Sequence, residues 1–341
     1  PGGTFDRPSL DGALALRRVR ESPSAPPPFV PGLLAPHPSD TVTIDELTGF
    51  LHNPARDFLR GRLGIFVPRD VDPIDDSVPI ALDSLQTWQI GDRALQQVVR
   101  GATVDAALQQ EDRRGSFPPG SLGAKARADV QSDLTALARG IHRPDDPPVR
   151  SVDIRLDLQT TDEAGTPGGA VRFTGVVSGL YGDQLRQHTF SRVGARQLIS
   201  AWVQLLAVAA TEPDHDHHAV LNGRKGTMRL RSPGAAAPQL LADLAQLRAL
   251  GQRYPMGVPP KTAYAFTKGN RIRMLRGDPA EALLLQFARN DWEGDRFDGE
   301  NADPYWVKIL GRGAPIDDIA VALRRFARRI WLPLLEHLDD A

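Results

Sequence analysis

Five consecutive side chains that can bind a metal ion stand in the middle of the sequence, at Asp214-His215-Asp216-His217-His218. Imidazole and carboxylate groups are common ligands of Zn²⁺ and Ni²⁺. Adjacent side chains point in different directions, so at most two or three of the five could reach one ion. A resident metal also needs outer groups that orient its ligands. We therefore interpret the segment as a solvated loop with no resident metal, in which His215, His217 and His218 are the candidate ligands for an adventitious ion.

Metal-dependent cleavage of DNA would need a different arrangement of residues. In one class of nucleases, carboxylates converge on Mg²⁺ and a lysine two residues after one of them orients the attacking water. The residues two positions before the five lysines are glycine, glycine, proline, phenylalanine and tryptophan, so the sequence contains no Asp/Glu-x-Lys motif. The nearest substitute is Asp153-Ile154-Arg155. An always-charged guanidinium is a poor base, and this pair is better explained as an exposed strand face.

Several other kinds of chemistry are excluded by residue types that the sequence lacks. Without cysteine there is no disulfide, thiolate zinc site, iron–sulfur cluster or cysteine nucleophile. The only Lys-Thr pair, Lys261-Thr262, follows two prolines, so there is no Gly-rich loop to bind a nucleotide phosphate. A serine hydrolase is disfavoured because there is no Gly-x-Ser-x-Gly motif. We therefore predict a non-catalytic domain that needs no cofactor.

Binding to DNA would depend on local clusters of basic residues, because the formal net charge of −1 provides no global positive field. Two segments, 222–231 and 268–276, each carry four cations, and such clusters can neutralise phosphates. Basic residues that alternate along a strand are equally typical of the solvated face of an edge strand. The candidate DNA contacts are Arg224, Lys225, Arg229, Arg231, Lys268, Arg271 and Arg273.

Hydrophobic periodicity predicts the elements that would position these residues. Residues 43–67 are expected to form two short amphipathic helices broken at Asn53-Pro54, with Asn53 as the N-cap of the second. A helical block at 84–139 precedes segments in which apolar and polar residues alternate, as in antiparallel strands. The predicted strands lie at 151–159, 170–190 (with a turn at 179–183), 219–222, 226–230 and 261–266, and the predicted later helices at 194–211, 238–254, 279–290 and 316–335.

These elements predict an α+β domain, in which a mixed sheet of four or five strands is flanked by helices and carries an α-helical insertion at about 84–140. We place this domain at 39–341 and interpret the Pro-rich residues 1–38 as a strap or linker from a preceding domain. No apolar run approaches the ~20 residues of a membrane helix, so we expect a cytoplasmic protein without a membrane partner. The chain begins without methionine, and we expect it to be a fragment or a processed form of a longer protein.

Five segments that span most of the chain resemble the C-terminal domain of RecC, the gamma subunit of exodeoxyribonuclease V (RecBCD). They are FDRPSLDGA (5–13), TIDELTGFLHNPARDFLRGRLGI (43–65), FPPGSLG (117–123), GVVSGLYGDQLRQHTF (175–190) and DPYWVKILGRGAPIDD (303–318). The resemblance implies a restriction-endonuclease-like fold of the PD-(D/E)XK type that has lost its active site. Active relatives carry Gly-x-x-Asp on one strand and Asp-x-Lys on the next. At the matching positions, Ser178 and Gln187 replace the two carboxylates and Thr189 replaces the lysine.

The same resemblance implies a role as a non-catalytic scaffold of a RecBCD-like helicase-nuclease in double-strand-break repair and recombination. We expect the domain to dock a RecD-type subunit, to assemble with a RecB-type subunit and to guide DNA. Two alternatives stay open. A metal-dependent DNA nuclease with displaced carboxylates would lose its activity on replacement of Asp153 or Asp183. A free-standing DNA-binding module would bind forked DNA with a salt-sensitive affinity that depends on the cations of segment 222–231.

Overall fold

The computed structural model describes residues 6–21, 28–37, 41–68, 82–141, 146–161, 167–276 and 284–339. Contacts within the chain divide it into two compact units, Pro1–Leu33 and Leu34–Ala341. The first unit contains helix α1 (Arg7–Glu21), which the sequence analysis did not predict. Among the helices in the described ranges, none combines the length and the apolar character that a bilayer crossing requires.

The second unit opens with the predicted helical pair. Its first elements are β1 (Thr41–Thr43), α2 (Ile44–His52), α3 (Pro54–Arg56) and the π-helical turn η1 (Asp57–Arg62). The N-terminus of α2 is closed by a capping box between Thr43 and Glu46. The backbone N–H of Arg56 donates to the side chain of Asn53 at 2.9 Å. The break at Asn53-Pro54 and the capping role of Asn53 are therefore confirmed.

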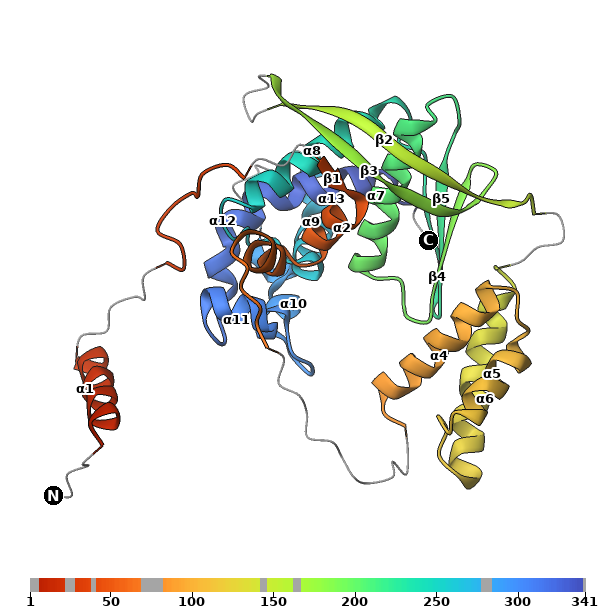
Figure 1. The fold of residues 1–341 in the computed structure, drawn as a ribbon, viewed down its shortest axis with the longest axis horizontal. Coiled ribbons are helices and arrows are strands. Elements are labelled where there is room, and N and C mark those ends of the chain that lie inside the picture. The colour runs from red at the N-terminus through yellow and green to blue at the C-terminus, as the bar shows by residue number, and fades with distance from the viewer. Residues whose placement is uncertain are drawn as a thin grey trace. The chain divides into compact units, whose positions relative to one another are not determined.

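Six strands form one mixed sheet (Figure 1). The strands after β1 are β2 (Val149–Thr161), β3 (Pro167–Tyr181), β4 (Gln184–Thr189), β5 (His218–Gly223) and β6 (Gly226–Leu230). Their order is β1-β3-β4-β5-β6, and β2 also pairs with β3. The β1–β3 and β4–β5 pairs are parallel and the others antiparallel. The α+β class and the mixed sheet flanked by helices are confirmed.

The strands differ from the predicted set because one strand was missed and one segment was assigned to the wrong element. β1 has three residues, too few for an alternating pattern to show. The segment 261–266, predicted as a strand, lies in helix α9 (Pro260–Leu275). Inside this helix the hydroxyl of Thr267 donates to the carbonyl of Ala263, and the amide of Asn270 donates to the carbonyl of Phe266. These bonds satisfy polar groups that a strand face would have left to the solvent.

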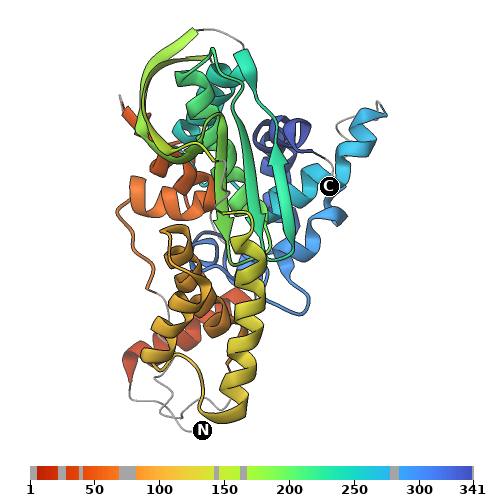
Figure 2. The same cartoon turned by 90° about the vertical axis from the view of Figure 1, so that its right-hand side faces the viewer.

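Helices α7 (Ala195–Thr211) and α8 (Ala237–Gly251) pack on the sheet and on each other (Figures 1 and 2). They confirm the helices predicted at 194–211 and 238–254. The helix predicted at 316–335 is a continuous helical stretch over 316–337 in which α, 3-10 and π turns alternate. Residues 277–283, which include the start of the helix predicted at 279–290, lie outside the described residues.

The remaining elements are η2 (Gly234–Ala236), η4 (Leu285–Phe287), α10 (Arg289–Glu293), η5 (Glu300–Ala302), α11 (Pro304–Leu310), η6 (Ile316–Ile319), α12 (Ala320–Ala322), η7 (Leu323–Ala327) and α13 (Arg328–His337).

The helical insertion consists of α4 (Ser84–Val99), α5 (Val104–Arg113) and α6 (Gly120–Ala138). Its helices share an apolar core that Phe190, directly after β4, also enters. The Phe190 ring occupies a notch at Gly91 of α4, where an added Cβ would lie 2.0 Å from the ring. The insertion is thereby packed against the end of the strand that precedes α7.

Candidate functional site

The three positions that were matched to nuclease residues from the sequence lie on the two strands that meet at the Gly182-Asp183 turn. Ser178 is on β3, and Gln187 and Thr189 are on β4. The hydroxyl of Ser178 lies 2.9 Å from that of Ser151 on β2, and the amide of Gln187 donates to Gln204 of α7 at 2.8 Å. All three side chains are neutral, so they do not supply the negative charge on which a Mg²⁺ site depends.

The acidic residues of β2 lie on an open face of the sheet. The carboxylate of Asp153 is 4.0 Å from the guanidinium of Arg155, and their side chains are 72% and 82% exposed. Asp157 pairs with Arg172 of β3 at 3.1 Å. Within the described residues, Asp153 belongs to no group of three potential metal ligands. These contacts support the interpretation of Asp153-Ile154-Arg155 as an exposed strand face.

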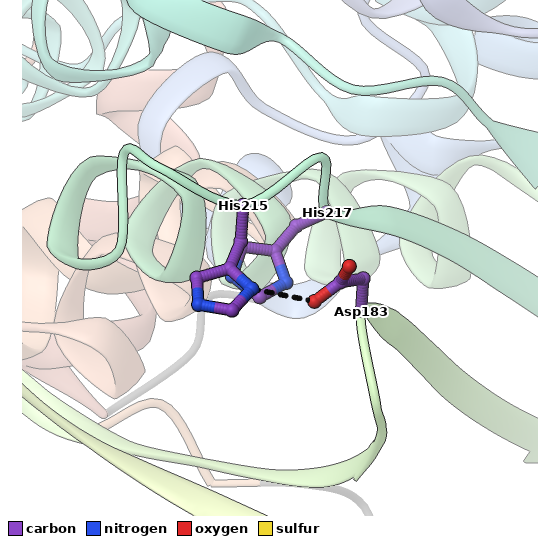
Figure 3. Close-up of side chains that lie close together, drawn as sticks. All are labelled: Asp183, His215 and His217. Carbon is purple, nitrogen blue, oxygen red and sulfur yellow. Dashed lines mark hydrogen bonds and ion pairs between the residues drawn. The ribbon is translucent and has the colours of Figure 1, made fainter.

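The structure brings two of the three candidate histidine ligands together with a carboxylate from another element (Figure 3). Asp183 lies in the turn between β3 and β4, and His215 and His217 lie in the loop between α7 and β5. Nδ1 of His215 is 2.9 Å from Oδ1 of Asp183, and the two imidazole rings stack with their centroids 5.4 Å apart. One ligand atom from each of the three residues lies within 4.8 Å of the other two. His218 is not part of this group, and its Nε2 instead lies 3.1 Å from the amide of Gln184.

A second layer of charged groups lies behind His217, which is completely buried. Nε2 of His217 is 2.9 Å from Oε2 of Glu212, the residue after α7. Arg150 of β2 donates two hydrogen bonds to the same carboxylate, at 2.8 and 2.7 Å. These hydrogen bonds lower the pKa of Glu212 below its ordinary value, although partial burial opposes the shift. Glu212 is therefore an anion held at a fixed place beside the imidazole.

The cations of segment 222–231 occupy the β5–β6 hairpin, at the edge of the sheet, but they do not form one free surface. Arg224 pairs with Asp133 of α6 at 3.4 Å, and its guanidinium lies 5.2 Å from the centre of the Phe190 ring. Arg231 pairs with Asp339 near the C-terminus at 3.2 Å. Two cations of this hairpin, Lys225 and Arg229, are exposed and form no ion pair within the described residues.

The cations of segment 268–276 lie on a helix, so their interpretation as the solvated face of an edge strand is wrong. All belong to α9 or directly follow it. Lys268 is exposed and lies 5.6 Å above the Tyr264 ring, whereas Arg271 and Arg273 are half-buried. With about 100° of rotation for each helical residue, Arg271 projects near Lys268 but Arg273 projects from another side. The segment therefore presents separate charges rather than a single cluster.

The group around Asp183 was missed in part because its members come from distant elements. The histidines are recognisable in the sequence as candidate ligands, but the sequence pairs them with no carboxylate outside their own segment. Their proximity to Asp183 depends on the parallel pairing of β4 with β5, which brings the start of β5 beside the β3–β4 turn. The N–H of His218 donates to the carbonyl of Asp183 at 3.1 Å. No sequence spacing carries this information.

Comparisons with known proteins identify the family. Residues 39–271 match the family model described as the RecC C-terminal domain. The chain is similar to the RecBCD enzyme subunit RecC of Mycolicibacterium smegmatis (34% identity over 97% of this chain and 30% of that protein) and of Mycobacterium tuberculosis H37Rv (31%, 97% and 30%). Similarity to subunit RecC of Escherichia coli K12 is lower, at 23% identity over 86% of this chain and 26% of that protein. The chain therefore spans less than a third of the length of these relatives, and it belongs to the RecC C-terminal domain family.

Proposed function

We propose that this chain is the non-catalytic C-terminal part of a RecC-type subunit that acts in DNA double-strand-break repair and recombination. The family match and the relatives that are named as subunits of the RecBCD enzyme support this role. The observation that carries the non-catalytic part is the neutral set Ser178, Gln187 and Thr189, of which the first two form hydrogen bonds to other side chains. A PD-(D/E)XK-type fold, which we include in the proposal, makes these the positions of a lost metal site.

The domain would act by docking a RecD-type subunit, in a complex that also contains a RecB-type subunit, and by guiding DNA. The helical insertion has its own apolar core, and the sheet has an exposed face around Asp153 and Arg155. Both offer surfaces that are not needed for packing within the domain. A scaffold needs such surfaces, whereas a nuclease needs converging carboxylates. Docking is therefore the function that the arrangement of the described residues supports best.

Docking is tested by mixing the chain with its cognate RecD-type subunit and measuring the mass of the product by light scattering after size exclusion, without DNA. We expect a stoichiometric complex at micromolar concentration. The full-length RecC-type subunit serves as the positive control. If the full-length subunit binds and this chain does not, the docking surface belongs to another part of RecC and our assignment is wrong.

The non-catalytic assignment is tested with linear DNA in Mg²⁺ or Mn²⁺ at a large excess of protein. We expect no cleavage by the chain. Variants Asp153→Ala and Asp183→Ala are the controls, because a nuclease with displaced carboxylates would depend on one of these residues. Cleavage that disappears in either variant would establish the nuclease and overturn the scaffold assignment.

A further inference from the structure

The β3–β4 turn and the loop before β5 hold three metal-ligand side chains for which the proposed scaffold has no use. They are Asp183, His215 and His217, which lie side by side in Figure 3. We propose that these three residues form a binding site for a divalent cation of the zinc class, and that the bound ion fastens the turn to the loop. These ligands are distinct from Ser178, Gln187 and Thr189, so the site does not depend on the proposed function.

The ligand types and their distances suit such an ion. Two imidazoles and one carboxylate form a set that suits zinc and its neighbours better than Mg²⁺ or Ca²⁺, which prefer oxygen ligands alone. A tetrahedral zinc ion with bonds of about 2.0–2.1 Å places its ligand atoms roughly 3.3 Å apart. The three ligand atoms already lie within 4.8 Å of one another. The half-exposed side chains of Asp183 and His215 can close the remaining distance, because they are free to change rotamer on their solvent side.

The buried member of the group has an unused ring nitrogen. His217 is completely buried, and neither ring nitrogen makes a hydrogen bond of ordinary geometry within the described residues. Nε2 lies 2.9 Å from the Glu212 carboxylate, which leaves Nδ1 for the ion. A buried imidazole nitrogen without a partner is unfavourable, and coordination of a cation would satisfy it.

The group also has the outer layer that orients the ligands in metal sites. A metal-binding histidine usually offers its second nitrogen to a carboxylate, which fixes the ring and increases its basicity. Glu212 has this position beside His217, and Arg150 holds Glu212 through two hydrogen bonds. Arg150 belongs to β2, so the sheet itself would support the site. Surface side chains that lie close together by chance are not expected to have such oriented partners behind them.

The test is a titration of the metal-free chain with Zn²⁺ in competition with a chromophoric chelator. We expect one ion for each chain and a rise in melting temperature with added Zn²⁺, because an ion that binds the folded state stabilises it. Co²⁺ in place of Zn²⁺ should give the visible absorption of a cation with nitrogen and oxygen ligands in a site of low coordination number. All three readouts are independent of DNA and of partner subunits.

Variants at the two exposed ligands test the assignment without endangering the fold. His215→Ala and Asp183→Asn should each weaken Zn²⁺ binding by at least tenfold, and Glu212→Gln by roughly 10-fold to 100-fold through its effect on His217. Asp216→Asn is the matched control, because Asp216 is an exposed carboxylate of the same loop outside the group. It should bind Zn²⁺ like the parent chain.

Three outcomes would overturn the proposal. Equal affinity in the parent chain, His215→Ala and Asp183→Asn would mean that the ion binds elsewhere. An equal loss in Asp216→Asn and in the ligand variants, or binding without a defined stoichiometry, would show an adventitious ion only, captured by the loop as a whole. Circular dichroism of each variant establishes that a loss of binding is not a loss of folding.

Discussion

At the scale of single residues, the contacts of a cation decide its role more than its charge does. Arg224 has the sequence context of a DNA contact, but its guanidinium pairs with Asp133 of α6 and lies over the Phe190 ring. It therefore joins the helical insertion to the sheet. Lys225 and Arg229, in the same hairpin, are exposed and have no ion pair within the described residues. Such side chains can exchange their counterions for a phosphate at little cost.

We predict that Lys225 and Arg229 carry the DNA affinity of the hairpin. The double variant Lys225→Ala/Arg229→Ala should lower the slope of log affinity against log salt by roughly 1.4–1.8, because each lost phosphate contact removes about 0.7–0.9. Fluorescence anisotropy with forked DNA at several salt concentrations measures this slope. The control Lys308→Ala/Arg312→Ala removes the same charge from exposed positions around α11. Equal effects of the two double variants would show a general charge effect rather than a contact.

Glu111 gives a prediction about pH. Burial raises the pKa of this carboxyl, but hydrogen bonds from Arg93 and Ser116 outweigh burial and the net shift is downward. A carboxyl group whose pKa is lower in the folded state stabilises the fold when the pH is above the pKa of the unfolded state, here 4.5. This stabilisation is lost as the pH falls through the lower pKa of the folded state. Glu111→Gln should therefore lower the free energy of unfolding by about 1–3 kcal/mol at pH 7.

Urea unfolding at a series of pH values measures the effect of Glu111. The difference between the parent chain and Glu111→Gln should shrink as the pH falls below 4.5. Asp112→Asn is the control, because the side chain of Asp112 is 41% exposed and its pair with Arg127 should contribute less than about 1 kcal/mol. If the difference in unfolding free energy between the parent chain and Glu111→Gln stays constant over this pH range, the ionised Glu111 carboxylate is not the source of the stabilisation.

At the scale of elements, the insertion and the sheet meet through a close fit between a ring and a helix backbone. The Phe190 ring lies against Gly91 of α4, where a methyl group has no space. Phe190 belongs to the core of the insertion, although it follows directly from β4. Phe190 therefore packs the insertion directly against the end of β4. Substitutions at either partner should weaken both the insertion and its attachment.

A double-mutant cycle tests this fit. Gly91→Ala should destabilise the chain by about 1–3 kcal/mol through overpacking, and Phe190→Ala by about 3–5 kcal/mol through the cavity it leaves. The double variant should be less destabilised than the sum, because the added methyl then enters the space of the lost ring. Gly49→Ala in α2, where a Cβ meets nothing within 4 Å, should be neutral or stabilising. Additive effects would mean that the two residues do not interact.

The elements that the sequence predicted correctly are those with local determinants. Thr43, Glu46 and Asn53 close the helix ends with their own side chains, so residues 43–62 could be assigned from sequence alone. The prediction of a strand at 261–266 was wrong because the buried face of α9 includes the polar residues Thr262, Thr267 and Asn270, so its helical spacing does not appear as a period of apolar residues. The group of Asp183 with His215 could not be predicted, because strand pairing creates it. Helix ends that are capped by neighbouring residues can be predicted from the sequence, whereas contacts between distant elements depend on how the strands pair.

At the scale of the whole molecule, the chain matches only one part of each of its longer relatives. Its relatives are more than three times as long, to judge from the 30% of their length that it covers. Surfaces that are exposed here can therefore be buried against other parts of such a protein. The docking experiment separates these cases, since it compares the chain with the full-length subunit. Helix α1 forms a separate compact unit with the residues around it.

The parallel pair of β1 and β3 determines when the domain can be completed during synthesis. Val42 of β1 pairs with Phe173 of β3, and the whole helical insertion is translated between them. At about 5–20 residues per second, the ribosome needs roughly ten seconds to reach β3. Until β3, α7 and α8 emerge, the apolar side chains of α2 that become fully buried, Leu47 and Phe50, have no cover. The first residues of the domain to be made are thus among the last to be protected, and the nascent chain is an expected client of chaperones over this interval.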